Sequence, residues 1–241
     1  EKKILLHPIF LIMENIILKQ ADTINFVSYG FKELYFGFNK VTKGQNITFY
    51  TQGISLKTRK YIQDLHFKST EKKAIKIFYA GNIGEGQDLL SLIEDLKNNV
   101  KSHFIMKKYN ISLVICGAGA QAKSIKNLIN DFKKSPKTYF LYEKIKYIGL
   151  LKKFEVLNYF ESMDCLLVHL AKYSSLSNVI PTKIFEYACT PLPILHGSSG
   201  FTKEFLRKIK GTIYFKQGDS FSLLKGALKS KKLTLTFRDR E

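Results

Sequence analysis

Residues 177–188 read Ser177-Asn178-Val179-Ile180-Pro181-Thr182-Lys183-Ile184-Phe185-Glu186-Tyr187-Ala188, and no other stretch of the 241-residue sequence is as informative. Pro181 suits the first turn of a helix, where its missing N–H group costs nothing, so the pattern predicts a helix over 181–188. The free N–H groups of Thr182 and Lys183 would then face whatever lies in front of that helix. Because a helix N-terminus and a lysine attract anions, and Glu186 in the first turn can accept hydrogen bonds from a sugar hydroxyl, the stretch indicates a nucleotide site. An amphipathic helix that buries its apolar residues explains the same pattern equally well.

Apolar runs bounded by turn residues alternate along the chain with segments of helical period. The predicted strands are 74–79, 111–116, 145–148, 165–170, 192–195 and 212–215, and the predicted helices are 89–100, 120–132, 154–163, 181–188, 201–209 and 220–229. Strict alternation of strand and helix is typical of α/β proteins with a Rossmann-like parallel sheet and helices on both faces. Ligands bind such sheets at the carboxyl ends of the strands. The loops after Tyr79 and Cys116 and the segment before Pro181 lie at or beside such ends, which predicts one nucleotide site.

Two glycine-rich loops follow predicted strands. In Gly81-Asn82-Ile83-Gly84-Glu85-Gly86, three glycines in six residues exceed what a turn requires and let the backbone approach a pyrophosphate; a tight strand-to-helix turn is the plainer interpretation. Gly117-Ala118-Gly119-Ala120-Gln121-Ala122 formally fits the dinucleotide fingerprint Gly-x-Gly-x-x-Ala. The fit is weak, because another strand–helix unit precedes this one. An NAD-dependent Rossmann oxidoreductase or epimerase therefore stays as the alternative enzyme class.

Several segments together resemble one family. Residues 181–194, Pro-Thr-Lys-Ile-Phe-Glu-Tyr-Ala followed by Leu-Pro-Ile, are similar to the signature Pro-Ser-Lys-x-Phe-Glu-Tyr of bacterial family 4 glycosyltransferases. Residues 78–90 resemble the glycine-rich loop that opens the family's donor domain, 111–119 its next strand and turn, and 145–149 its base-binding loop. Residues 21–28 resemble a stretch near the end of the acceptor domain. All of them occur in the family's order.

The resemblance implies the GT-B fold and the synthesis of O-antigen, capsule or related surface glycans. Residues 1–56 would be the last part of an N-terminal acceptor domain with its linker, and 57–241 the nucleotide-sugar donor domain, so the chain looks incomplete. The implied reaction moves a sugar, with retention, from a nucleotide-diphosphate donor to a lipid-linked acceptor. The implied partners are that donor and that acceptor. A gene fragment, a separately encoded half and a trimmed chain each fit the incomplete acceptor domain, and a separate acceptor-domain polypeptide would be a further partner in the second case.

The resemblance also implies roles for particular residues. Glu186 would hold the ribose, the backbone around Ile148 and Gly149 the base, and Asn178 the sugar, while Lys183 stabilises the charge of the leaving diphosphate. The catalytic candidates are accordingly Lys183 and Asn178. The donor-binding candidates are Gly81, Gly84, Glu85, Gly86, Gly117, Ile148, Gly149, Pro181, Thr182, Lys183 and Glu186.

The sequence departs from the family pattern at two points. Eight positions before Glu186, where the family often has a second glutamate, this chain has Asn178, which can hydrogen-bond a hydroxyl but carries no charge. The glycine-rich loop also lacks the arginine or lysine that many relatives place near the diphosphate, so Lys183 would have to serve. No His, Cys or carboxylate cluster has the spacing of a metal site, and we expect neither a metal nor another cofactor.

The formal charge of +19 indicates an anionic partner. Most of the excess is lysine scattered along the chain without an arginine-rich arm or interleaved aromatic residues, which favours an anionic membrane surface over nucleic acid. An AT-rich coding sequence explains the same lysine content equally well. A basic module that binds membranes or nucleic acid is the alternative outside the enzymes.

The remaining features bear on location and on single residues. Three well-separated cysteines in apolar stretches predict buried thiols and fit a reducing cytoplasm, so we expect a cytoplasmic protein at the inner face of the membrane. The most apolar stretch, Ile4–Leu18, is interrupted by polar residues and predicts a helix that lies on the membrane or packs on a missing domain. His169 and His196 follow predicted strands, where a lone histidine is more often structural than a ligand.

Overall fold

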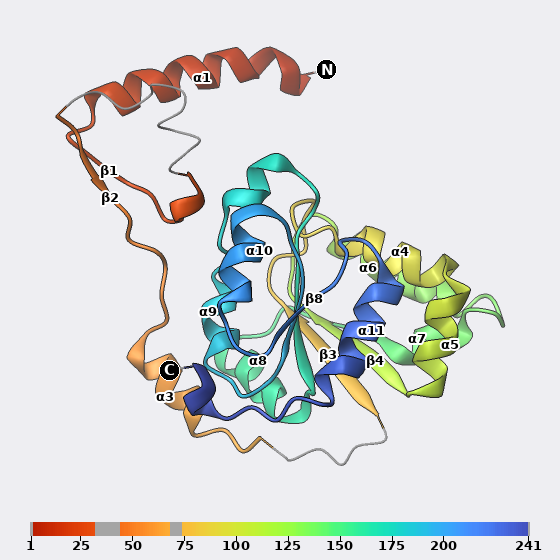
Figure 1. The fold of residues 1–241 in the computed structure, drawn as a ribbon. Helices are drawn as coiled ribbons and strands as arrows, with labels where there is room; N and C mark the ends of the chain where they lie inside the picture. The colour runs from red at the N-terminus through yellow and green to blue at the C-terminus, as the bar shows by residue number, and fades with distance from the viewer. Residues whose placement is uncertain (1, 32–43, 68–73, 241) are drawn as a thin grey trace.

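A six-stranded sheet forms the centre of the computed structural model, which describes residues 2–31, 44–67 and 74–240 (Figure 1). Its strands are β3 (Ile75–Ala80), β4 (Ile111–Cys116), β5 (Ile145–Gly149), β6 (Cys165–His169), β7 (Ile194–Gly197) and β8 (Thr212–Tyr214). They lie in the order β5-β4-β3-β6-β7-β8, and every neighbouring pair is parallel. All six predicted strands are confirmed, although β7 begins two residues later than expected, after Pro193, which has no N–H group to donate to a ladder.

Helices cover both faces of this sheet, on the two sides of it in Figure 1. One layer contains α4 (Leu89–Asn98), α5 (Val100–Lys108), α6 (Ala122–Phe132), α7 (Tyr139–Lys144) and α11 (Ser220–Ser230); the other contains α3 (Leu56–Gln63), α8 (Lys153–Tyr159), α9 (Lys183–Ala188) and α10 (Gly200–Arg207). Side chains alternate across a strand, so Ile77 and Tyr79 of β3 pack into the first layer while Phe78 and Ala80 pack into the second. Burial on both faces explains why the strands read as nearly continuous apolar runs. The predicted α/β class is confirmed.

The sequence did not predict α5 and α7, and it placed some helix ends differently. The helix predicted to reach residue 100 ends at Asn98, because the side chain of Asn99 accepts a hydrogen bond from the N–H of Ser102 at 3.2 Å and so begins α5. The helix expected over 154–163 divides into α8 and a 3₁₀ turn, η2 (Phe160–Ser162). None of these differences moves the loops at the carboxyl ends of the strands.

The described residues among the first fifty, 2–31 and 44–50, contain a second, small sheet. They form α1 (Lys2–Gln20), β1 (Thr23–Asn25), the 3₁₀ turn η1 (Tyr29–Phe31) and β2 (Asn46–Thr48), and β1 and β2 pair in parallel, apart from the large sheet (Figure 1). They meet the rest of the chain where Ser28 Oγ donates to the carbonyl of Asn178 at 2.5 Å, in the 3₁₀ turn η3 (Ser174–Asn178). Within residues 2–31, 44–67 and 74–240, no helix is both long and apolar enough to span a bilayer. The division at residue 56, where α3 begins, stays a prediction.

Arg240 connects the C-terminal turn to the end of α9. Arg240, in the 3₁₀ turn η4 (Phe237–Arg240), donates through Nη1 to the carbonyls of Tyr187 and Thr190 at 3.1 and 2.7 Å, and through Nη2 to that of Leu192 at 2.8 Å. These carbonyls follow or end α9, so a cation lies at the C-terminus of that helix, where it is favourable.

Candidate functional site

The two central strands separate before they reach their carboxyl ends. β3 and β6 pair only at Ile77 with Cys165 and at Phe78 with Leu166. At Ala80 the hydroxyl of Tyr187, from α9, accepts the backbone N–H at 3.0 Å and donates to the carbonyl at 3.3 Å. Strand order also reverses here, because β4 and β5 lie on one side of β3 and β6 to β8 on the other. Such a switch point is where ligands of open α/β sheets bind.

A cavity of about 600 Å³ opens above this gap. It is walled by the loops that follow β3, β4, β5 and β6 and by the start of α9. Its lining residues are Ala80, Gly81, Asn82, Gln87, Cys116, Gly117, Ala118, Leu150, Leu151, Lys153, Val156, Leu170, Leu176, Val179, Pro181, Thr182, Lys183 and Glu186. The structure therefore brings together six of the predicted donor-binding residues: Gly81, Gly117, Pro181, Thr182, Lys183 and Glu186.

Gly81 and Gly117 let two loops touch at the floor of the cavity. Both have positive φ angles, of 140° and 143°, and the N–H of Gly81 donates to the carbonyl of Cys116 at 3.0 Å. A Cβ on Gly117 would lie 1.8 Å from the carbonyl oxygen of Gly81. Gly119 is packed similarly, because its Cβ would lie 2.4 Å from the carbonyl of Ile83. Contact between the loops thus accounts for both glycines of the apparent dinucleotide fingerprint.

Lys183 places a buried ammonium group in the cavity wall. Among the described residues Nζ has no hydrogen-bond partner, and it has no exposure to solvent, although other atoms of the side chain are partly exposed. It lies 3.7 Å from the centroid of the Tyr79 ring, and a Cβ on Gly81 would come within 2.7 Å of it. Burial lowers the pKa of Lys183 from 10.5 to about 7, with the nearby Glu186 acting weakly in the opposite direction. An ammonium removed from water, with Glu186 nearby but no hydrogen bond to its Nζ, fits a site that receives an anion.

Glu186 lies one turn further along α9, at the mouth of the cavity. Its carboxylate is 3.3 Å from Nζ of Lys153, at the start of α8, and the two side chains are 30% and 50% exposed. An exposed pair of this kind contributes little to stability, so the carboxylate can exchange Lys153 for a ligand hydroxyl. Lys153 was not predictable as a site residue, because nothing in the sequence connects it to α9.

The helix predicted over residues 181–188 is α9, and it is shorter than predicted. The predicted helix is present, but α9 begins two residues later than expected, at Lys183, after a tighter turn in which the N–H of Ile184 donates to the carbonyl of Pro181 at 3.0 Å. Within the described part of the chain, the N–H groups of Thr182 and Lys183 have no hydrogen-bond partner. The two free amides predicted from the sequence are thus present, beside the lysine.

Gln87 and Asn82 are polar lining residues that the sequence analysis did not select. Gln87 Oε1 accepts from Asn82 Nδ2 at 2.9 Å and from the N–H of Gly84 at 3.3 Å, which closes the glycine-rich loop on itself. Asn82 is further held through its carbonyl, which accepts from the hydroxyl of Tyr79 at 2.5 Å. The loop therefore has a fixed shape before any ligand binds.

His169 connects this loop to the other half of the sheet. Its Nδ1 lies 2.7 Å from the carbonyl of Gln87, and its Nε2 lies 2.9 Å from the N–H of Gly218. A carbonyl can only accept and an amide N–H only donate, so the ring is neutral with its proton on Nδ1. Burial lowers the pKa of His169, which keeps it in that form. His196 is likewise buried, with Nδ1 2.9 Å from Ser198 Oγ, and burial lowers its pKa to about 4.

Several predicted site residues lie outside the cavity lining. Gly84 and Gly86 shape the loop behind the lining, and Glu85 is exposed to solvent. Asn178 lies in η3, where its carbonyl accepts from Ser28, and its role toward a sugar stays a prediction.

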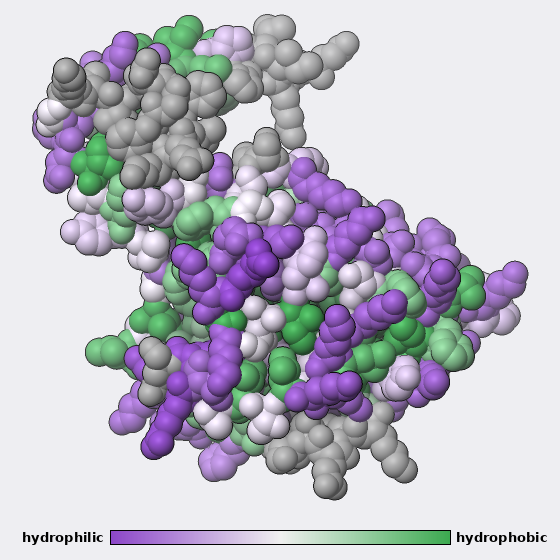
Figure 2. Space-filling view, viewed as in Figure 1, coloured by the Kyte–Doolittle hydropathy of each residue, from purple (hydrophilic) through white to green (hydrophobic). Residues whose placement is uncertain are grey.

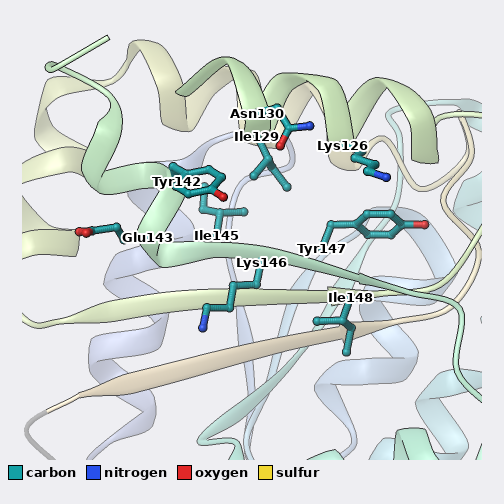
Figure 3. A pocket seen from close by; sticks show the side chains of 9 residues that line it. All are labelled: Lys126, Ile129, Asn130, Tyr142, Glu143, Ile145, Lys146, Tyr147 and Ile148. Atoms are coloured by element: carbon teal, nitrogen blue, oxygen red, sulfur yellow. The ribbon is translucent and has the colours of Figure 1, made fainter. Parts of the chain in front are cut away.

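Ile148 and Gly149 are also outside the lining, which includes Leu150, Leu151 and Val156 of the segment that follows β5. Gly149 supports the site indirectly, since its carbonyl accepts the N–H of Gly117 at 2.8 Å. Ile148 instead lines a groove of about 570 Å³ along the outer edge of β5, under α6, with Lys126, Tyr147 and six others (Figure 3). That groove has no buried, unpartnered polar atom in its lining, unlike the cavity that contains Lys183.

The described residues contain no cluster of the side chains that usually bind metal ions. Across 2–31, 44–67 and 74–240, no three His, Cys, Asp or Glu side chains are grouped so that they could hold a metal ion. The cations that face the cavity are Lys153 and Lys183.

Comparison with known proteins identifies the fold. No protein-family model matches the sequence, and no curated protein sequence is significantly similar to it. Solved structures are similar. They include Anabaena HepE in complex with UDP and glucose (TM-score 0.60, 11% identity, 87% of this chain and 53% of that one). A variant of S. aureus TarM in complex with UDP, fondaparinux and α-GlcNAc-glycerol has a TM-score of 0.62 at 12% identity, over 91% and 39% of the two chains. The lipopolysaccharide outer core galactosyltransferase WaaB, without ligand, has a TM-score of 0.56 at 12% identity, over 88% and 53%.

At such low identity these likenesses show the fold, which is the Rossmann-like α/β fold of GT-B glycosyltransferases. The chain spans about half the length of HepE and WaaB and less of TarM.

Proposed function

We propose that this chain contains the donor-binding part of a GT-B glycosyltransferase, and that its ligand is a nucleoside-diphosphate sugar. The observation that carries the proposal is the buried ammonium of Lys183, unpartnered, in a cavity at the switch point of the sheet. HepE and TarM, which have a similar fold, were crystallised with UDP, and this supports the choice of ligand.

Each wall of the cavity suits one part of such a donor. The diphosphate would lie between Nζ of Lys183, the free N–H groups of Thr182 and Lys183, and the backbone at Gly81. Glu186 would accept hydrogen bonds from the ribose hydroxyls, and its ion pair with Lys153 would then be broken. The base would lie on the apolar side chains after β5, Leu150 and Leu151, rather than at Ile148 as the sequence suggested.

The chemistry that these residues can support is the departure of the nucleoside diphosphate. As the glycosidic C–O bond breaks, negative charge grows on the diphosphate oxygens. An ammonium and two amides already in place stabilise that charge without reorganisation, which is the main catalytic device of such preorganised sites. Lys183 is the catalytic residue in this proposal, and Asn178 would approach the sugar from η3.

The finer assignments rest on the sequence resemblance. We propose family 4, retention of configuration, and a lipid-linked acceptor of O-antigen or capsule type, at the cytoplasmic face of an anionic membrane. Similarity to WaaB, a lipopolysaccharide galactosyltransferase, supports the class of product. The acceptor would bind to residues outside the donor cavity.

A thermal-shift screen tests this proposal. UDP, GDP, CMP and their sugars are added to the full chain one at a time, with NAD as the competing class, because a ligand that binds the folded state raises the melting temperature. We expect UDP or GDP, and the matching sugar nucleotides, to stabilise the protein. Stabilisation by NAD that UDP and GDP do not displace would reject the proposal in favour of an oxidoreductase.

A further inference from the structure

Helix α5 has an apolar stripe on the face that it turns away from the core. Ser102, Ile105 and Met106 are its buried residues and pack under it. On a helical wheel, with 100° between successive residues, Val100 and Phe104 lie on the face opposite these buried residues. Their side chains are 76% and 63% exposed. A surface helix with one buried face normally carries polar residues there, so these two side chains call for an explanation.

Lysines surround this stripe. Between Leu96 and Asn130 the sequence has six lysines and no aspartate or glutamate. A shallow cleft of about 700 Å³ runs beside Val100 and Phe104, and the loop between α6 and α7 forms its far side. We define the α5 surface as the exposed stripe with the lysines on and beside it, namely Lys97, Val100, Lys101, Phe104, Lys107, Lys108 and Lys137. In Figure 2 apolar side chains lie among hydrophilic ones at the side of the molecule where α4, α5 and α7 lie.

We propose that the α5 surface docks on an anionic lipid bilayer. Val100 and Phe104 would enter the boundary between head groups and acyl chains, and the lysines would lie at the level of the phosphates. Lysine suits this arrangement, since its long stem lies along apolar groups while its ammonium remains in water. Lys107 and Lys108 already lie over the rings of Phe140 and Phe104, at 4.2 and 5.6 Å.

Residue types favour a bilayer over nucleic acid. Recognition of nucleic-acid phosphates and bases commonly uses arginine, whose planar group binds them in pairs of hydrogen bonds. The chain has no arginine between Arg59 and Arg207. The exposed stripe of the α5 surface includes an aliphatic side chain, Val100, which cannot stack on a base. An aliphatic residue beside a phenylalanine suits acyl chains.

The proposal is independent of the donor cavity. The residues of the α5 surface do not line the cavity, and α5 lies in the helix layer opposite that of α9. Membrane binding and nucleotide binding can therefore be lost separately, so failure of one does not imply failure of the other.

Co-sedimentation of the full chain with vesicles tests the proposal. We expect binding to vesicles of phosphatidylglycerol and phosphatidylcholine in equal amounts, and weak binding to phosphatidylcholine alone or at about 0.5 M salt. Val100→Ser with Phe104→Ser should weaken binding about tenfold or more. Lys101→Gln with Lys108→Gln should weaken it about fivefold for each lysine.

Matched controls lie on the other helix layer. Leu56→Ser changes a side chain that is 84% exposed, and Lys60→Gln with Lys208→Gln removes the same charge as the double lysine variant. These should bind vesicles like the parent chain. Equal losses in both charge variants would mean that net charge alone drives binding, and unchanged binding of the Val100 and Phe104 variant would place the membrane contact elsewhere, as on α1. Either result overturns the proposal, as would tight binding to DNA with none to vesicles.

Discussion

Replacing Lys183 by methionine should stabilise the folded protein. Methionine keeps most of the length of the side chain and removes the ammonium, whose Nζ is shielded from solvent and has no hydrogen-bond partner among the described residues. Most substitutions in a buried wall destabilise. Here the opposite sign follows from the cost of keeping a charge out of water.

The magnitude follows from the pKa. A value of about 7 in place of 10.5 means that the charged form of Lys183 costs the folded state at most about 4 to 5 kcal/mol. The sign is fixed by proton binding: between pH 7 and 10.5 the unfolded chain holds the proton on Lys183 and the folded chain releases it, so the stability of the parent rises with pH there. The full cost is present below pH 7 and disappears towards pH 10.5.

The assay is urea unfolding of parent and Lys183→Met at about pH 6 and about pH 9, where the gain of the variant should shrink by about 2 to 3 kcal/mol between the two. Lys153→Met is the matched control, because it removes a half-exposed lysine from the same cavity and should give no such gain. A variant that is no more stable than the parent at either pH would refute the claim that Nζ is unpaired, and with it the reason for expecting an anion.

Three further results follow from single contacts. Glu186→Gln should lower the affinity for nucleoside and nucleoside diphosphate together, about tenfold, since a charged hydrogen bond to ribose is lost; calorimetry with uridine and UDP measures it. Gly117→Ala places a Cβ 1.8 Å from the carbonyl of Gly81 and should destabilise by about 1 to 3 kcal/mol or more in urea, whereas Gly53→Ala, with nothing within 4 Å, should not. His169→Asn keeps a donor towards Gln87 but has no basic nitrogen. Because burial lowers the pKa of His169, the parent should lose stability as the pH falls below 6.5, and the variant should lose less; parallel urea curves across that range would contradict the assignment of a neutral ring.

The sheet was predictable because its residues are buried on both sides. Six apolar runs of four to six residues separated by helical segments leave few alternatives to a parallel α/β sheet, and runs such as Ile111–Cys116 match the strands residue for residue. The break at Asn99 was missed because its role depends on a cap, which the period of apolar residues does not reveal.

A third of the cavity lining, six of its eighteen residues, was predictable for a local reason. Lys183 and Glu186 are one turn apart, and the glycines sit directly after strands, so short stretches of sequence carry that information. The contacts between Lys153 and Glu186, His169 and Gln87, and Tyr187 and Ala80 join residues 33, 82 and 107 positions apart. Only the folded chain brings them together, and no sequence pattern marks the partners.

Calorimetric titration of the full chain with UDP and GDP, in the presence of EDTA, tests the central claim most directly. The claim is that Lys183 and the amides beside it bind the diphosphate. We expect binding without metal at pH 8, with proton uptake visible as a dependence on the ionisation enthalpy of the buffer, because the anion recharges an amine whose pKa is about 7 in the free protein. Lys183→Met should bind the diphosphate more weakly and take up no proton, while uridine binds both proteins alike. Binding that requires Mg²⁺ or Mn²⁺, or that is the same in the parent and the Lys183→Met variant, would contradict the account.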